Sequence, residues 1–293
     1  MANDLSAFNS QVWSRLLIRN LDKVNVMLPL VNMDYEGEIK NLGDTVQVRT
    51  LGSVTVGSYT KGSTISYQDL TPTKEAMTIA DAQYFAFKVD DVDLAQNDIK
   101  AIDAYTKRAA VAMNDEIEEK LLSNYAAAHA SNRITGASSA ALTLTSSNLY
   151  GYVVDARTAL SKQNVPTQDR WLVIDPDTTS LFLKDTTNFI RATDLSDAVI
   201  RQGNLSGVVE QPGFVGRIAG FNVFESNNVP SASGAKYLQY GDAMAIAYAA
   251  QIKEVEAMRL QTTFANAVRG LLLHDTKVFA EASKRLGYIK AAA

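Results

Sequence analysis

The stretch from Asp90 to Ala128 contains neither proline nor glycine, and it constrains the fold more than any other part of the sequence. Its apolar residues recur at helical spacing: Ile99, Ile102, Ala109, Met113, Ile117 and Leu121. Its first turn is rich in aspartate, which suits the positive end of a helix dipole. A helix from Asp93 to Tyr125 would be roughly 50 Å long at about 1.5 Å per residue. Because this exceeds a typical compact domain, the sequence predicts an elongated molecule.

This stretch also accounts for the acidity of the chain. Residues 90–120 hold nine acidic and four basic residues, while the whole chain has a formal net charge of −4. A protein whose main task is to grip nucleic acid shows a basic excess. The charge therefore argues against such a role, although it allows DNA to lie nearby without adhesion.

The composition limits the classes of protein to which the chain can belong. The 293 residues allow two small domains or one large one, and 46% hydrophobic residues are enough for a core. The absence of cysteine rules out disulfides, thiolate nucleophiles and zinc sites with cysteine ligands. The start, "MANDLSAFNSQ", has an acid where a secretory leader has basic residues. No apolar stretch approaches the roughly 20 residues of a membrane helix. We expect a soluble chain made in the cytoplasm.

The N-terminal region is predicted to be helical over residues 8–28, where apolar residues form an imperfect stripe. Arg15, Arg19 and Lys23 stand four residues apart on another face. Such a row can contact an anionic partner or form an ordinary solvated face, and we favour the solvated face.

Residues 35–91 read as a long two-stranded β-arm. Val46 and Val48 alternate with polar residues, as do Val54 and Val56, and we expect Ile79 and the run Tyr84–Val89 to form the partner strand. The tip between them, from Gly57 to Pro72, is rich in glycine, serine and threonine. A lone two-stranded hairpin is marginal in water, so we expect it to lie against a neighbouring subunit.

The second half alternates helices and strands. Residues 148–163 are predicted to form a helix, "RWLVID" a buried strand, and "PDTTSLFLKD" a short helix with Pro176 in its first turn. "GRIAGFNVFESNNVP" reads as strand and turn, and residues 236–290 return mainly in strands.

The glycines Gly213, Gly216 and Gly220 raise the question of a phosphate-binding loop. Their spacing is G-x-x-G-x-x-x-G, neither a P-loop nor a dinucleotide fingerprint, and no helix follows to present its amides. We interpret them as conformational. Gly216 and Gly220 would let the chain bend into a strand at Phe221–Phe224, and "SNNVP", ending at Pro230, would turn it out again.

Other catalytic and metal motifs are weak. "GASSA" imitates a nucleophile elbow but lacks the strand before it and the helix after it. "DDVD" has too few oxygen ligands and no turn glycine for a calcium loop. We therefore expect no catalytic residue, metal or cofactor.

Several stretches in order resemble the major capsid proteins of tailed bacteriophages, specifically the coat proteins of short-tailed phages. They are "YEGEIKNLGDTVQVR", the long acidic helix, "RWLVIDPDTTSLFLKD" and "GRIAGFNVFESNNVP". The matching residues are Gly43-Asp44-Thr45-Val46, Val173, Asp175-Pro176, Ser180-Leu181, Gly220-Phe221, Val223, Ser226-Asn227 and Val229-Pro230. The resemblance covers roughly residues 5–290.

The resemblance implies an α+β chain with the Hong Kong 97-type capsid fold. Residues 1–34 would be an N-terminal arm, 35–92 the extended hairpin loop, 93–129 the spine helix of the peripheral domain, 130–250 the axial domain, and 251–293 strands returning to the peripheral domain. Copies would form the hexamers and pentamers of an icosahedral virion shell. This shell would enclose packaged DNA without binding it sequence-specifically. A separate scaffolding protein is implied, because the arm begins almost at once. A portal protein, and in some relatives a decoration protein, would complete the particle, with no membrane partner.

Some shells of this family carry a Lys–Asn isopeptide bond, and Lys61 at the hairpin tip is suggestively placed. That bond also needs an Asn and a buried Glu on neighbours, so we interpret Lys61 as an ordinary solvated or ion-pairing residue. With Lys61, the interface candidates are Gly57, Pro72, Arg15 and Arg19. Two alternatives remain: an encapsulin-like compartment, and a soluble α/β enzyme.

Overall fold

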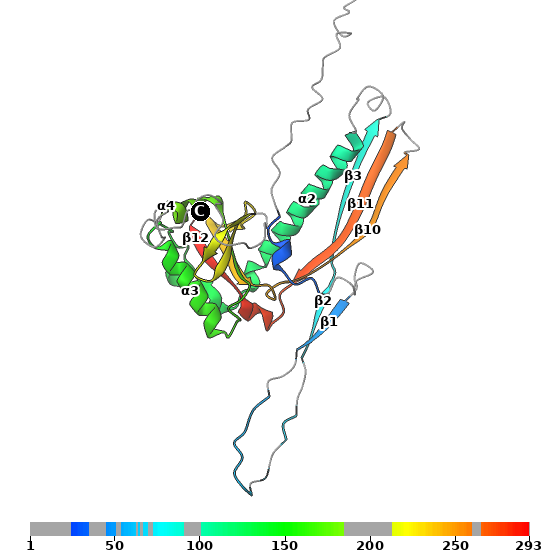
Figure 1. The fold of residues 1–293 in the computed structure, drawn as a ribbon. Helices are drawn as coiled ribbons and strands as arrows, with labels where there is room; N and C mark the ends of the chain where they lie inside the picture. Colours follow the sequence, from blue (N-terminus) through cyan, green and yellow to red (C-terminus); the bar gives the residue numbers. More distant parts are fainter. Residues whose placement is uncertain are drawn as a thin grey trace, which may run out of the picture.

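The structure is a computed structural model that describes residues 25–34, 45–50, 54–62, 64, 67–69, 73–90, 101–184, 213–259 and 265–292. The chain forms a long lobe, a compact lobe and a projecting β-arm (Figure 1). The long lobe combines one long helix with a three-stranded sheet, and the compact lobe is a seven-stranded sheet with two helices. This mixture of helices with largely antiparallel sheets is the α+β class that we expected.

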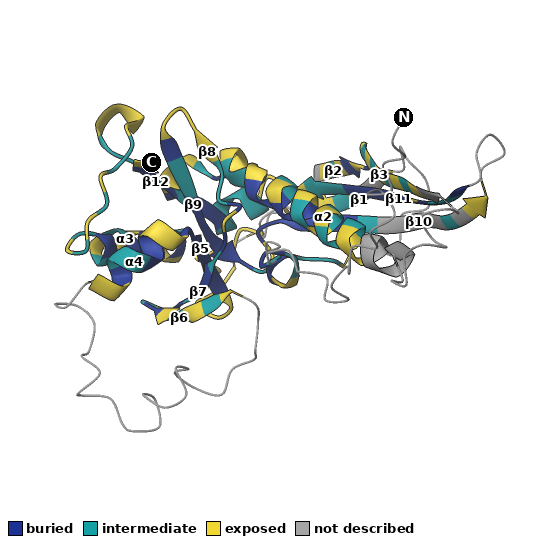
Figure 2. Ribbon diagram, turned by 90° about the horizontal axis from the view of Figure 1, so that it is seen from above, coloured by how far each residue is buried: buried dark blue, intermediate teal, exposed yellow. Residues whose placement is uncertain are grey.

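In the long lobe, α2 (Ala101–Ser123) lies beside an antiparallel sheet in the order β10 (Ala247–Arg259), β11 (Ala265–Lys277), β3 (Asp81–Asp90) (Figure 1). Along β3 the side chains alternate between half-buried and exposed. The half-buried positions Gln83 and Phe85 lie toward α2, because successive side chains of a strand point to opposite faces. The outer face of α2 is exposed (Figure 2).

The compact lobe is built on a sheet in the order β4 (Arg133–Ile134), β12 (Leu286–Ala292), β9 (Ala235–Asp242), β5 (Arg170–Ile174), β7 (Phe221–Glu225), β6 (Phe214–Ile218), with β8 (Ser231–Ala232) paired to β9. Helices α3 (Leu149–Lys162) and α4 (Pro176–Lys184) complete it. Short 3₁₀ helices cover Leu28–Leu30, Asn124–Ala127, Ala130–Asn132, Ala137–Ser139 and Ala282–Arg285.

Strand β5 explains how the two lobes join. Leu172 and Ile174 pack in a cluster with the buried face of α3, whereas Trp171 and Val173 pack in another cluster with Leu121 of α2. Every residue of β5 is buried. A strand covered on both faces reads as a continuous apolar run, which is why "RWLVI" was recognisable in the sequence.

The β-arm, defined as residues 45–78, differs from the sequence prediction in its pairing. Strands β1 (Thr45–Thr50) and β2 (Thr73–Thr78) pair in antiparallel register from Thr45↔Thr78 to Thr50↔Thr73. The predicted partner Tyr84–Val89 lies instead in β3 and pairs with β11. The prediction was wrong because β3 gains a thirteen-residue neighbour and one covered face, which β1 could not supply. Val54 and Val56 lie outside the strands and are exposed.

Helix α2 ends earlier at its C-terminus than the sequence predicted. It ends at Ser123, and the chain continues as the 3₁₀ helix Asn124–Ala127 rather than as an α-helix to Tyr125. Asn124 explains the change, because its side-chain amide donates to the carbonyls of Lys120 and Leu121, which the continuing helix would otherwise use. The expected beginning, residues 93–100, lies outside the described residues.

The predicted helix over residues 8–28 can be compared with the structure only at its end, since residues 1–24 lie outside the described part. There it was wrong. Residues 25–27 are not helical, and Leu28–Leu30 is a 3₁₀ helix with Pro29 near its start. The α-conformation is disfavoured for a residue that precedes a proline. Val26 and Met27 are instead buried between α2 and the compact lobe.

The expected division at residues 250 and 251 does not coincide with the division between the sheets. Strand β10 already begins at Ala247 in the long lobe, and β12 returns to the compact lobe, where it pairs with β9 and β4. The chain therefore passes from the compact lobe to the long lobe and back again, which ties the two together.

Candidate assembly surfaces

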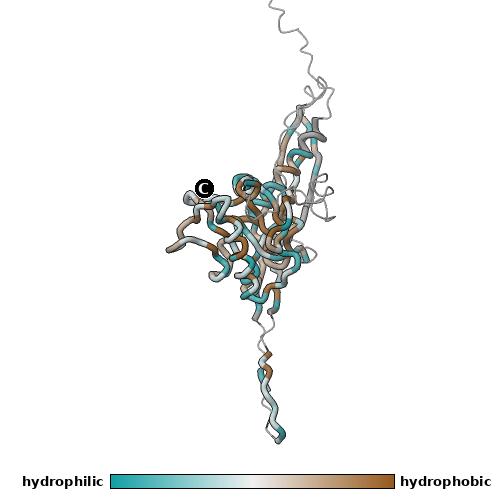
Figure 3. The backbone as a smooth tube through the Cα atoms, turned by 60° about the vertical axis from the view of Figure 1, so that its left-hand side comes forward, coloured by the Kyte–Doolittle hydropathy of each residue, from teal (hydrophilic) through white to brown (hydrophobic). Residues whose placement is uncertain are grey.

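The β-arm is the largest described feature without a core of its own. It extends away from both lobes in two views (Figures 1 and 3). All its described tip residues, in the range 54–69, are exposed, and they include the apolar Val54, Val56, Tyr59 and Tyr67. Val56 is 92% exposed and Tyr67 94%. Large apolar side chains exposed on a projection make the tip a candidate surface for contact with another molecule.

The β-arm is anchored at its root. Met77 and Ile79 are buried in a cluster with Leu273 of β11 and Phe279. The Ala80 N–H donates to Asp275 Oδ2 at 3.2 Å, and the Ala280 N–H donates to Glu75 Oε2 at 2.9 Å. The root is thus fixed to the long lobe while the tip is exposed to solvent.

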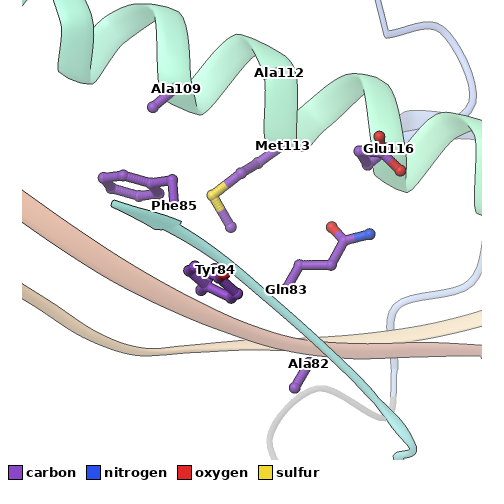
Figure 4. Close-up of a pocket in the computed structure, with 8 residues that line it drawn as sticks. All are labelled: Ala82, Gln83, Tyr84, Phe85, Ala109, Ala112, Met113 and Glu116. Carbon is purple, nitrogen blue, oxygen red and sulfur yellow. The ribbon is translucent and has the colours of Figure 1, made fainter. Parts of the chain in front are cut away.

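A groove between β3 and α2 is a second candidate surface. It has a volume of about 420 Å³ and is lined by Ala82, Gln83, Tyr84, Phe85, Ala109, Ala112, Met113 and Glu116 (Figure 4). Met113 points from α2 toward β3, and Gln83 points from β3 toward α2. Gln83 Oε1 is buried, and no described residue donates a hydrogen bond to it. The groove is therefore apolar along most of its length, with an unpaired acceptor and the carboxylate of Glu116 at one end.

The two lobes meet at a buried carboxylate, Glu118 of α2. Its Oε1 accepts hydrogen bonds from the Val26 N–H at 3.3 Å and from the Ser226 hydroxyl at 2.8 Å. Its Oε2 accepts from Asn228 Nδ2 at 3.2 Å, and the same amide donates to Asp115 at 2.5 Å. Burial raises the pKa of Glu118, and these hydrogen bonds offset only part of that effect. Glu118 thus joins three segments that are far apart in the sequence.

A second polar cluster fixes the start of α4. Asp175 accepts hydrogen bonds from the backbone N–H and the hydroxyl of Thr178, as an N-cap does. Lys236 lies 2.6 Å from Asp175 and 2.7 Å from Asp177. Burial alone would raise the pKa of Asp175, but the hydrogen bonds from Lys236 and Thr178 outweigh it and lower the pKa. These bonds tie the first turn of α4 to Lys236 of β9.

The structure describes two of the five predicted interface residues. Gly57 and Lys61 are exposed on the β-arm, while Pro72, Arg15 and Arg19 lie outside the described residues. The interface role of Lys61 stays a prediction.

The glycine-containing turn is a structural feature of the compact lobe. Ala219 and Gly220 connect β6 and β7 as the two central residues of a hairpin, with φ of 49° and 89°. Positive φ at both positions matches the right-handed twist of the strands. Phe221 and Val223 are fully buried on one face of β7. Pro230 follows, and its carbonyl accepts from the Tyr237 N–H at 2.9 Å.

Gly216 does not make the bend that we predicted. It lies within β6, next to a bulge between Phe214 and Gly216, and a Cβ there would meet no atom within 4 Å. The reversal is made by Ala219 and Gly220 instead. The sequence interpretation gave weight to two glycines where only one has a positive φ.

Sequence reasoning missed Glu118 and Asn228, which form the junction between the lobes. The available signal was the polar "SNN" between apolar strands, which we took only as a turn. In the described part of the chain, no cluster of three or more His, Asp or Glu side chains could hold a metal ion. None of the described helices combines the length and apolar composition of a membrane span.

Comparison with solved structures agrees with this architecture. A structure from Mycobacterium phage Che8 is 23% identical, with 96% of each chain covered and a TM-score of 0.75. The capsid of cyanophage P-SCSP1u is 15% identical, covering 100% of this chain and 95% of the other, with a TM-score of 0.72. The SrpI encapsulin of Synechococcus elongatus PCC 7942 is 10% identical, covering 98% and 95%, with a TM-score of 0.62. These likenesses establish the fold.

Comparison with curated proteins finds no match. The family model described as "Phage capsid protein" matches residues 74–288, which is well over half of the chain. The match includes the long lobe, the junction at Glu118 and nearly all of the compact lobe. The chain therefore belongs to the phage capsid protein family: it is a structural, self-associating major capsid protein of a tailed bacteriophage, with the Hong Kong 97-type fold and an icosahedral shell as its assembled form.

Proposed function

We propose that this protein encloses double-stranded phage DNA in its shell and that the β-arm joins neighbouring copies. The observation that carries the proposal is the exposure of large apolar side chains on a two-stranded arm without a core, which favours a covered arm in the assembled state. Copies would form hexamers and pentamers in the virion. They would be made in the host bacterial cytoplasm and guided by a separate scaffolding protein. A portal protein and a decoration protein are further proposed partners.

The groove between β3 and α2 is a suitable acceptor for the β-arm of a neighbouring copy. Val56 and Tyr67 can pack on its apolar lining, and Lys61 carries a charge opposite to that of Glu116. The net charge of −4 suits a shell that contains DNA without adhering to it.

We also propose a division of the chain into domains. Residues 1–34 form an N-terminal arm, residues 35–92 form the extended loop, and the compact lobe corresponds to the axial domain.

Deletion of residues Gly57–Pro72 tests the function of the β-arm. The root at Met77 and Ile79 stays intact, so we expect a folded subunit that forms no closed shells in electron micrographs, with or without a scaffolding partner. The matched control is Met244→Ala, which removes another exposed apolar side chain, 53% exposed, outside the β-arm. It should assemble normally. Normal shells from the deletion would contradict the proposal.

The groove is tested separately with Met113→Lys. A cation in the apolar lining should prevent docking, because the incoming side chains cannot solvate it. We expect unchanged secondary structure by circular dichroism and loss of closed shells. Shell formation at the wild-type level would remove the groove from the proposal while leaving the deletion experiment to judge the β-arm.

The encapsulin likeness supports a second candidate, a compartment that holds a protein rather than DNA. The contents of purified particles distinguish the two. We expect nuclease-protected double-stranded DNA. A co-purifying enzyme in particles that contain no DNA would favour the compartment. We also propose that the chain has no catalytic activity, so an active-site titration with general hydrolase probes should label nothing.

A further inference from the structure

His274 of β11 is a buried polar side chain without a partner. It has no exposed surface, and no described residue forms a hydrogen bond with either Nδ1 or Nε2. It lies on the face of β11 that carries Leu272, so the ring is held between the sheet and α2, with its centroid 6.2 Å from that of Tyr248. Buried polar groups are normally paired, so this exception needs an explanation.

Three charged residues are neighbours of His274 in the long lobe. Asp81 of β3 stands directly opposite in the ladder, Asp275 is the next residue along β11, and Lys120 comes from α2. From β10, the described neighbours are the uncharged Ala250 and Tyr248. Lys120 Nζ lies 2.6 Å from Asp81 and 3.9 Å from Asp275. Two carboxylates are therefore close to the imidazole, and both are engaged by Lys120.

The same carboxylates fix the root of the β-arm. Asp275 accepts the hydrogen bond from the Ala80 N–H, at the point where β2 ends and β3 begins. Asp81 is the first residue of β3 and holds it to α2 through Lys120. His274 is thus next to the two contacts that set where the β-arm leaves the long lobe.

We propose that His274, Asp81, Asp275 and Lys120 form a pH-responsive joint, which holds the root of the β-arm closed while His274 is neutral and loosens it when His274 is protonated. A buried imidazolium is costly without an acceptor. The neighbouring acceptors are the carboxylates of Asp81 and Asp275, and a shift of either toward the imidazolium would weaken its contact with Lys120 or with Ala80. An unpaired imidazolium destabilises the packing around His274, and a paired one weakens the contacts of the carboxylates. In either case the junction between β2 and β3 loosens.

The direction of the pH effect follows from burial. Burial lowers the pKa of His274, the two aspartates oppose this, and Lys120 adds to it. Because the folded-state pKa lies below that of the unfolded chain, the contribution to stability is present above the unfolded pKa of about 6.5 and is lost as pH falls through the folded pKa. Mild acidification is therefore the condition that opens the joint.

The chain has only two histidines, which makes a matched experiment available. His129 is the control: it is half-buried, and its Nδ1 accepts from the Ser131 N–H. Thermal unfolding of the unassembled, full-length chain is compared at pH 7.5 and 5.5 for wild type, His274→Phe, His274→Gln and His129→Gln. We expect the pH-dependent fall in Tm to shrink in both His274 variants, by about 2–4 °C for each kcal/mol of linkage removed. His129→Gln should behave like wild type.

Amide hydrogen exchange gives the local readout. After correction for the intrinsic effect of pH on exchange, residues 77–84 of the wild type should exchange faster at pH 5.5 than at 7.5, whereas β5 should not change. This increase should be absent in His274→Phe. Equal pH dependence of Tm in all four proteins overturns the proposal, and so does an unchanged exchange rate at residues 77–84. The wild-type comparison alone decides the matter if the His274 variants prove insoluble.

Discussion

The compact lobe and the β-arm are opposites in the way they use apolar residues. In the compact lobe, β5 and β7 bury such residues on both faces, between α3 on one side and α2 on the other. At the tip of the β-arm, valines and tyrosines lie on the surface, and the arm is anchored at its root. A region that completes its own packing defines the subunit. A region that leaves its packing incomplete is the one that we propose a neighbouring subunit covers.

The largest expected effect is on the compact lobe. Phe221→Ala removes a fully buried ring and should lower the free energy of unfolding by about 3–5 kcal/mol. Tyr67→Ala on the β-arm is the matched aromatic control, and it should change that free energy by no more than about 0.5 kcal/mol. Urea unfolding of both unassembled variants measures the contrast. Equal destabilisation would show that the β-arm packs within its own subunit.

A break in α2 should rank next. Ala109→Pro removes a backbone donor in the middle of Ala101–Ser123 and should cost about 3 kcal/mol or more. Total stability is commonly about 5–15 kcal/mol, so we expect insoluble protein. Ala109→Ser, which keeps the donor, should be soluble. A soluble, assembling proline variant would contradict a continuous helix at this position.

The junction between the lobes should be sensitive to Glu118. Glu118→Ala leaves the Val26 N–H and the Ser226 hydroxyl without an acceptor, while Asn228 keeps Asp115, and each buried unsatisfied group costs about 1–3 kcal/mol. Its contribution to the pH dependence is opposite to that of His274. Because the folded-state pKa is raised, stability from this group is present below the unfolded pKa and decreases as pH rises through the folded pKa. Glu118→Gln should abolish this component, as measured by urea unfolding from pH 4.5 to 7.5. An unchanged pH profile in Glu118→Gln would show that the carboxylate is not held as described.

The smallest effect is expected at the hairpin turn. Gly220 has a φ of 89°, so Gly220→Val should cost about 1–2 kcal/mol from backbone strain alone, since no atom lies within 4 Å of the new Cβ. Ala219→Gly, at the neighbouring positive φ, should be neutral or slightly stabilising. Neither variant nor the wild type should bind nucleotide. ATP or GTP binding by the wild type, lost in a still-folded Gly220→Val, would restore the phosphate-loop interpretation.

The sequence predicted those elements whose signal is local. The fully buried strand at "RWLVI" and the helices at 148–163 and at Pro176 followed from hydrophobic runs and a proline position. The partner of β1 did not follow, because "TKEAMT" has little β-character and Tyr84–Val89 has much. Pairing depends on which neighbour buries more surface, and that is not a local property.

The candidate surfaces were harder to predict than the fold. Exposure of Val56 and Tyr67 could not be read from the letters, because the same alternation describes a covered strand. The roles of Glu118 and His274 depend on contacts across about a hundred residues or more, such as those between Glu118 and Ser226 and between His274 and Asp81. Polar residues in an apolar setting were the only local sign of either site.

Trypsin cleavage at Lys61 tests whether a neighbouring copy covers the β-arm in the assembled shell. Lys61 is exposed on the β-arm of the isolated subunit. We expect rapid cleavage after Lys61 in unassembled protein and strong protection in assembled shells, with Lys284, half-buried on the 3₁₀ helix Ala282–Arg285, as the internal reference site. Mass spectrometry of the fragments over time gives both rates. Equal cleavage at Lys61 in subunits and shells, with the reference unchanged, would contradict the claim that the β-arm is covered by a neighbouring copy.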